Sequence, residues 1–251
     1  MSKVTIILPT YNCEKYIEET LNSIIEQSFE DWKLIIVDDA SKDNSIIIIK
    51  KFLSDERITL KKLKKNKGAG FCRNFALRES FSKYIAFIDS DDIWNKDKLK
   101  KQIHFMETNN LDFTYTNYTP FKVKKGIKKF QREIKPPEKL TYNLFTKKTS
   151  ICTSSMMVKR EQIGLTKFIN TKICEDYFFK CKLLKKCNSV RNFNETMTYY
   201  RISKNSLQSK KLRNFYWVWY INKRYNKMNF INNILSLFFI SINSIKNYGF
   251  K

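Results

Sequence analysis

The sequence predicts an α/β fold in which a mostly parallel sheet is flanked by helices and followed by a helical, basic and aromatic C-terminal extension. In the first third of the chain, short apolar runs alternate with segments of helical periodicity, a pattern typical of parallel strands covered on both faces. Polar and acidic residues stand directly after several of these runs. The 251 residues are 42% hydrophobic and 15% aromatic, which is enough to form a large buried core.

The first third predicts four strands and the helices that connect them. Residues 13–28 carry apolar side chains at a helical period, and residues 68–80 form a second helix that opens with Gly68 and Gly70. Residues 41–54 contain four consecutive isoleucines, which fit a helix or a strand equally well. The four strands are expected at Val4–Leu8, Lys33–Asp39, Arg57–Leu63 and Tyr84–Asp89.

The rest of the chain is less regular. Helices are expected at 95–110 and 174–187, a short helix after Pro136, strands turning near Gly126 within 112–135, and further strands at 154–160 and 196–202. From about Ser206, basic residues alternate with aromatic ones and then with Ile, Leu and Phe at roughly helical spacing. We therefore expect one large domain at 1–205 and a helical extension at 206–251.

The charge and cysteine content limit the class of protein. The chain has 48 basic and 24 acidic residues, a formal charge of +24. Part of this excess fits a lysine-rich solvated surface, and part indicates an anionic partner, either nucleic acid or an acidic membrane. Six cysteines without a CxxC pair and one histidine do not predict a zinc site. The start of the chain does not resemble a secretory leader, so we expect reduced thiols and a cytoplasmic location. The apolar run at Ile234–Ile242 is too short to span a bilayer.

An apolar run at residues 84–88 ends on three carboxylates, Asp89, Asp91 and Asp92. Like charges this close repel one another, so the cluster indicates a bound cation or a reaction rather than a contribution to stability. Two carboxylates beyond a buried strand suit a hard ion such as Mg²⁺ or Mn²⁺, with a substrate phosphate supplying further oxygens. An acidic turn in solvent would have the same composition, and it is the preceding strand that favours the metal site.

Other polar residues follow the neighbouring strands. They are Pro9, Thr10, Tyr11 and Asn12 after the first strand and Asp38 and Asp39 after the second. In a parallel sheet such ends meet at one edge, where ligands bind. An aspartate here can accept a hydrogen bond from a nucleobase or a ribose, although Asp38 could equally cap the following helix. Tyr11 offers a ring for base stacking, and Arg73 could reach a base carbonyl or a phosphate.

Five motifs, taken in order, make the chain resemble the family 2 glycosyltransferases, inverting enzymes with the GT-A (Rossmann-like) fold that use nucleotide-diphosphate sugars. The motifs are ILPTYN, IIVDDAS, NKGAGFCRN, AFIDSDDIW and CEDYFF, between about Val4 and Ser206. The resemblance implies a UDP-sugar donor by default, Mn²⁺ or Mg²⁺ as cofactor, and a glycan or lipid-linked acceptor in surface polysaccharide or lipooligosaccharide assembly. It also implies a nucleotide-binding half at 1–95 and an acceptor half at 96–205.

The family pattern also implies roles for individual residues. Those expected to bind the nucleotide sugar are Pro9, Thr10, Tyr11, Asp39, Arg73, Asp89, Ser90 and Glu175. Asp91 would ligate the metal that bridges the diphosphate, and Asp176 would be the catalytic base. Asp176 could instead only cap its helix, which is the weaker interpretation given the motif match. Ala40 stands where the family usually has glycine, which puts only the loop shape in doubt because alanine disfavours positive φ.

The C-terminal extension allows two interpretations. Its basic residues Lys210, Lys211, Arg213, Lys223, Arg224 and Lys227 alternate with Phe215, Tyr216, Trp217, Trp219 and Tyr220. Helices of this composition lie in membrane interfaces, so residues 210–242 are a candidate surface for an anionic membrane, with the protein peripheral on the inner face of the cell membrane. The aromatic residues could equally pack as core on the acceptor side of the domain.

Other classes of protein fit the sequence less well. A nucleic-acid-binding protein agrees with the charge, but the chain has no recognised binding motif, and its acidic edge would repel phosphates. A sugar-phosphate nucleotidyltransferase usually has a Gly-rich loop after its first strand, whereas LPTYNCEKY has no glycine. A non-catalytic sugar-binding descendant would be expected to have lost Asp91 or Asp176, and this chain has both. We therefore expect a nucleotide sugar and an acceptor as partners, and no nucleic acid.

Overall fold

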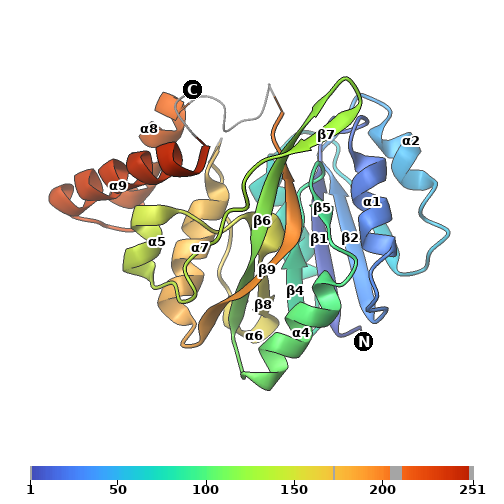
Figure 1. Cartoon of the computed structure of the whole chain (residues 1–251). Helices are drawn as coiled ribbons and strands as arrows, with labels where there is room; N and C mark the ends of the chain where they lie inside the picture. The colour runs from blue at the N-terminus through green and yellow to red at the C-terminus, as the bar shows by residue number, and fades with distance from the viewer. Residues whose placement is uncertain (1, 172, 204–210, 249–251) are drawn as a thin grey trace.

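The computed structural model describes residues 2–171, 173–203 and 211–248. One twisted sheet crosses the molecule, with helices on both faces and a pair of C-terminal helices at one side (Figure 1). In the described ranges the sheet has nine strands in the order β3-β2-β1-β4-β8-β6-β9-β5, and β7 pairs with β6. The predicted fold class is confirmed.

The N-terminal half is a parallel sheet with its connecting helices, as the alternating pattern predicted. Its elements are β1 (Val4–Thr10), α1 (Ile17–Ile25), β2 (Trp32–Asp38), α2 (Ser45–Lys50), β3 (Ile58–Lys62), α3 (Ala69–Arg78) and β4 (Tyr84–Phe87). The isoleucine run that fitted either structure is helical, within α2. β1 pairs in parallel with both β2 and β4, and Thr10 is in register with Asp38. The carboxyl ends of these strands therefore lie side by side at one edge.

The second half continues the same sheet with a change of direction. Its elements are β5 (Ile93–Trp94), α4 (Lys98–Thr108), β6 (Phe113–Lys124), β7 (Ile127–Phe130), α5 (Tyr142–Lys148), the 3₁₀ turn η1 (Thr153–Ser155), β8 (Met157–Lys159), α6 (Arg160–Ile163), α7 (Glu175–Lys186) and β9 (Val190–Arg201). β8 is antiparallel to both β4 and β6, so β6 and its parallel neighbour β9 run in the direction of β4. Arg201 at the end of β9 is thereby brought to the edge that carries Asp89. The predicted turn near Gly126 is confirmed, since β6 and β7 form an antiparallel pair around it.

Two hydrophobic cores fill the space on either side of the sheet. One lies under α3, α5 and α7 and contains a cluster of rings in which Phe179 packs against Phe87 and Phe168. The other lies under α1 and α4 and contains Trp32 and Trp94. Four of the six cysteines are buried and all six are free thiols, in agreement with the expectation of reduced cysteines.

The C-terminal extension is helical, as predicted, and consists of α8 (Lys211–Arg224) and α9 (Phe230–Tyr248). Val218, Ile221 and Ile240 are buried in the same core as Phe179. The aromatic side chains of α8 that could have formed core are more exposed than Val218 and Ile221, and Tyr216 is 60% exposed. Residues 206–210 of the predicted extension, Lys210 among them, lie outside the described residues. No helix in the described ranges is long and apolar enough to cross a membrane.

Candidate active site

The ends of β1 and β2 are joined by the carboxylate of Asp38. Asp38 is buried and accepts hydrogen bonds from Thr10 Oγ1 at 3.2 Å and from the Ser41 amide at 2.9 Å. The Thr10 hydroxyl is therefore engaged inside the protein, and Asp38 holds the loop together; it does not cap α2, whose N-cap residue is Asn44. Pro9 is buried in β1, whereas Tyr11 is 47% exposed, so its ring is available for stacking.

Asp39 fixes the loop that leads into α3. Its two carboxylate oxygens accept hydrogen bonds from the backbone amides of Lys67 and Gly68, at 2.6 and 2.7 Å. Ala40, the next residue, has φ 62°, in the left-handed region that the glycine of related sequences adopts without cost. The loop shape that the alanine had put in doubt is therefore a left-handed turn, held at some conformational cost.

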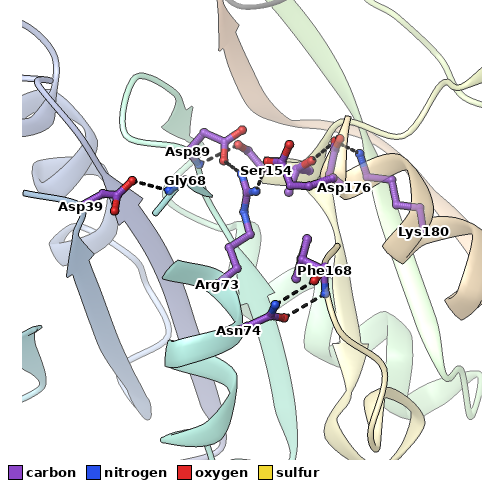
Figure 2. A network of polar contacts seen from close by, with 11 residues as sticks. Asp39, Gly68, Arg73, Asn74, Asp89, Ser154, Phe168, Asp176 and Lys180 are labelled. Atoms are coloured by element: carbon purple, nitrogen blue, oxygen red, sulfur yellow. Dashed lines mark hydrogen bonds and ion pairs between the residues drawn. The ribbon is translucent and has the colours of Figure 1, made fainter. Parts of the chain in front are cut away.

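Arg73 is the buried link between the two halves of the site. From α3 its guanidinium donates to Asp89 Oδ1 at 2.6 Å and to Glu175 Oε1 at 2.7 Å (Figure 2). Burial favours the neutral form of Arg73, but the two carboxylates outweigh it and raise its pKa. Burial raises the pKa of Glu175, and Arg73 opposes this rise. Arg73 was expected near the nucleobase; in the structure its guanidinium pairs the end of β4 with the start of α7.

The close approach of α3 to α7 depends on Gly70. A Cβ atom at this position would lie 2.9 Å from the carbonyl oxygen of Ile169 and 3.0 Å from Glu175 Cγ. These distances leave no room for a side chain between the two helices. Gly70 thus allows Glu175 to reach Arg73.

The carboxylates after β4 differ in their surroundings. Asp92 is buried and accepts hydrogen bonds from Ser154 Oγ and from the Arg201 amide at 2.9 Å, and burial with two neighbouring aspartates raises its pKa well above the ordinary value. Burial, together with the charge of Asp89, raises the pKa of Asp91 to about 6. In the described part of the chain, no side chain donates a hydrogen bond to the Asp91 carboxylate. Its negative charge therefore lacks a partner in direct contact.

A divalent cation fits this environment. Burial and a neighbouring like charge both disfavour the ionised form of the Asp91 carboxylate. A hard cation that prefers oxygen ligands would stabilise the ionised form. The described residues do not contain three His, Cys, Asp or Glu side chains grouped closely enough to hold an ion alone. An ion at Asp91 would therefore need oxygens from outside these side chains, such as those of a substrate phosphate or of water.

Asp176 lies in the first turn of α7, and Figure 2 shows its carboxylate beside Lys180. Its Oδ2 accepts hydrogen bonds from Thr153 Oγ1 at 2.8 Å and from the buried Lys180 ammonium at 2.7 Å. Burial would raise the pKa of Asp176, but Lys180, Arg73 and Thr153 together hold it below the ordinary value. The carboxylate is therefore charged at neutral pH, and its Oδ1 accepts no hydrogen bond from the described residues.

The structure adds three residues that the sequence did not indicate. Ser154 donates to Asp92 and accepts from the Asp89 amide, and Arg201 donates to the Asp91 carbonyl at 2.8 Å. Ser154 comes from the turn η1 and Arg201 from the end of β9, both far from Asp89 in the sequence, and neither carries a local signal. Lys180 could have been found, since it lies four residues after Asp176 and so on the same face of the predicted helix.

The sequence-predicted site residues lie along one edge of the sheet. Arg73 is in direct contact with both Asp89 and Glu175, and Asp176 follows Glu175 in the first turn of α7. The backbone carbonyl of Ser90 accepts a hydrogen bond from Thr20 at 3.1 Å. The remaining residues, Pro9, Thr10, Tyr11 and Asp39, stand at the ends of β1 and β2.

Comparisons with known proteins agree on one family. The model of the family described as "Glycosyl transferase family 2" matches residues 5–163. The chain is 36% identical over 229 residues to the "Putative teichuronic acid biosynthesis glycosyltransferase TuaG" of Bacillus subtilis, covering 91% of this chain and 90% of that protein. It is 35% identical over 217 residues to the "UDP-Glc:alpha-D-GlcNAc-diphosphoundecaprenol beta-1,3-glucosyltransferase WfgD" of Escherichia coli, covering 86% and 83%.

Solved structures share the fold at lower sequence identity. Residues 1–349 of S. aureus TarS in complex with UDP-GlcNAc match with a TM-score of 0.74 and 21% identity, covering 97% of this chain and 73% of that one. The mannosyltransferase PcManGT of Pyrobaculum calidifontis, in complex with GDP-Man and Mn²⁺, matches with a TM-score of 0.68 and 17% identity, covering 100% and 76%. At these identities the likeness shows the fold.

The link made by Arg73 can be tested by Arg73→Met, which leaves Asp89 and Glu175 facing each other without a cation. Because an uncompensated buried charge is costly, we expect the free energy of unfolding to fall by roughly 3 kcal/mol in urea denaturation. The control is Lys3→Met, which breaks the surface ion pair with Glu107 and should cost about 1 kcal/mol or less. An equal loss in the two variants would contradict the role of Arg73.

Proposed function

The chain belongs to glycosyl transferase family 2, and from this premise we propose that it moves a hexose or an N-acetylhexosamine from a nucleotide-diphosphate sugar to a hydroxyl group of a glycan or lipid-linked acceptor. We propose UDP as the nucleotide and inversion at the anomeric carbon. Two similar proteins support this choice, because their names include teichuronic acid biosynthesis and a glucosyl transfer from UDP-Glc to a diphosphoundecaprenol-linked sugar. Family membership replaces the nucleotidyltransferase and nucleic-acid-binding alternatives.

One observation carries the proposal: a single buried guanidinium joins the end of β4, where Asp89 and Asp91 lie, to the start of α7, where Asp176 follows Glu175. The reaction needs negative charge on the departing diphosphate to be neutralised and the proton of the attacking hydroxyl to be removed. These two tasks require carboxylates in separate places, one with a cation and one without. Asp91, beyond β4, and Asp176, in α7, meet this requirement.

On the donor side, the residues at the strand ends bind the nucleotide. Tyr11 stacks on the base, and Asp39 accepts from it through lone pairs not used by the Lys67 and Gly68 amides. Asp89 contacts the ribose, and Asp91 would hold a Mn²⁺ or Mg²⁺ ion. When bound, this ion supplies positive charge against the diphosphate.

On the acceptor side, Asp176 acts as the general base. The acceptor oxygen attacks the anomeric carbon, the bond from that carbon to the diphosphate oxygen breaks, and the hydroxyl proton passes to Asp176 Oδ1. Thr153 and Lys180 hold the other oxygen and so fix the direction in which Oδ1 points. A single displacement with one base inverts the configuration. If the acceptor is the lipid-linked one, the enzyme would work at the inner face of the cell membrane.

The proposed function is tested by Asp176→Asn. We expect turnover to fall by about 10²–10⁴-fold because the general base is lost, while UDP binding stays within about twofold. Release of UDP is measured from a panel of UDP-sugars with a diphosphate-lipid-linked sugar as acceptor, and Glu79→Gln, an exposed carboxylate after α3, is the control. If none of the UDP-, GDP-, CDP- or dTDP-sugars is consumed by the unmodified protein, the proposed function is wrong.

Lys180→Met tests the preparation of the base. Removing the ammonium lets the pKa of Asp176 rise, so protonation inactivates the enzyme at a higher pH than before. We expect the acidic limb of the kcat/KM profile to move up by roughly 1–3 pH units. Lys180→Arg should restore most of the original profile, and Lys182→Met, on the exposed side of α7, should not change it. A lower rate with an unmoved limb would indicate that Lys180 only supports the fold.

The metal site predicts a pH dependence of Mn²⁺ binding. Without the ion the pKa of Asp91 is about 6, so a proton competes with the metal below that pH. Titration calorimetry with UDP present should show Mn²⁺ affinity that is constant above pH 7 and falls about tenfold per unit below 6, since one proton is exchanged. Asp91→Asn should bind the ion weakly at every pH, and undiminished binding by this variant would exclude Asp91 as a ligand.

A further inference from the structure

Helix α9 has the reverse of the usual arrangement of a surface helix. Its side facing the protein mixes polar and apolar side chains: Asn233 and Ser236 are each 1% exposed, and Ile240 is buried beside them. Its outward side carries seven large apolar side chains, between 39% and 70% exposed: Phe230, Ile231, Ile234, Leu235, Phe238, Phe239 and Ile242. These positions repeat every three to four residues and form one continuous stripe along the helix. We call these seven residues the α9 stripe.

The buried polar side is held by hydrogen bonds, so the exposure of the α9 stripe does not come from loose packing. Asn233 donates to the Trp219 carbonyl at 3.1 Å and accepts from Asn222 at 3.1 Å. Ser236 donates to the Thr146 carbonyl of α5 at 2.6 Å. These bonds fix the rotation of α9 about its own axis, because turning the stripe inward would leave buried polar groups without partners.

The surroundings of the α9 stripe are positively charged. Lys147 and Lys148, in the last turn of α5, are exposed beside it, and the Lys147 ammonium lies 5.5 Å from the centre of the Phe239 ring. Lys227 and Lys246 are exposed near the two ends of the helix. The last acidic residue in the sequence is Glu195, so α8 and α9 contribute no acidic side chain to balance them.

We propose that the α9 stripe docks on the surface of an anionic lipid bilayer, with α9 lying in the plane of the headgroups. An apolar stripe with a basic rim is the pattern of helices that insert one face into a membrane interface. The basic residues add attraction to anionic lipid, and α9 is not apolar enough to span the bilayer. The charge also argues against a second copy of the chain as the occupant, because two such faces would bring basic rims of the same sign together.

Docking would hold the base at a fixed height above the membrane. The Tyr177 hydroxyl of α7 donates to Asn222 of α8 at 2.8 Å, and Tyr177 is the residue after Asp176. The pair α8–α9 is thereby attached to the helix that carries the base. The consequence for a lipid-linked acceptor rests on the proposed function, whereas docking itself does not.

The test is flotation of the full chain with vesicles, in the absence of donor and acceptor. We expect binding to vesicles of equal phosphatidylglycerol and phosphatidylcholine, at least tenfold weaker binding to pure phosphatidylcholine, and weakening by salt. The double variant Ile234→Glu/Phe238→Glu should bind the anionic vesicles at least tenfold less. The matched control is Ile47→Glu/Phe81→Glu, which changes an isoleucine and a phenylalanine exposed by 62% and 73% elsewhere, and which should bind like the unmodified protein.

Two outcomes would overturn the proposal. One is equal flotation of the unmodified protein and the α9 variant. The other is no flotation of the unmodified protein together with a dimer in light scattering that the α9 variant dissociates, which would assign the stripe to a second copy. Circular dichroism and the midpoint of thermal unfolding verify that each variant is folded. Because no transfer reaction is measured, failure of the proposed function leaves this result unaffected, and the reverse also holds.

Discussion

The site depends on one buried cation. Asp89 follows β4 and Glu175 begins α7, and the two carboxylates are held within reach of each other by Arg73. Without a positive charge between them, burial and mutual repulsion would separate the two segments. Gly70 permits this contact because a side chain there would collide with Glu175. The spacing between Asp89 after β4 and Glu175 at the start of α7 is therefore set by α3, which carries neither residue.

Much of the fold and of the donor side could be predicted from the sequence for a physical reason. Parallel strands place their carboxyl ends at one edge, so Thr10, Asp39 and Asp89 had to meet once the alternation of strands and helices was recognised. Asp176 is different, because no local pattern relates it to that edge, and only the order of the motifs indicated its role. Ser154 and Arg201 could not be predicted, since their place at this edge depends on how η1, β8 and β9 join the sheet after the antiparallel β8, which apolar runs do not encode.

The C-terminal helices illustrate a second limit. The helical spacing of Phe230, Ile234 and Phe238 was visible in the sequence, and so was the basic character of the region. Which side of the helix faces outward was not visible, because it is decided by hydrogen bonds from Asn233 and Ser236 to α8 and α5. Asparagine and serine are usually surface residues, so a pattern-based assignment would bury the apolar side.

Lys180 and Asp176 lie one turn apart on the same helix, and their remaining partners come from the stretch between Ile151 and Thr153. The proposed base is thus oriented by α7 and the short stretch that leads into η1, and Arg73, through Glu175, links this segment to the end of β4. Lineages could then replace the loops around α7 to suit new acceptors while inheriting a working base unchanged. Diversification of the glycan products would require few simultaneous substitutions.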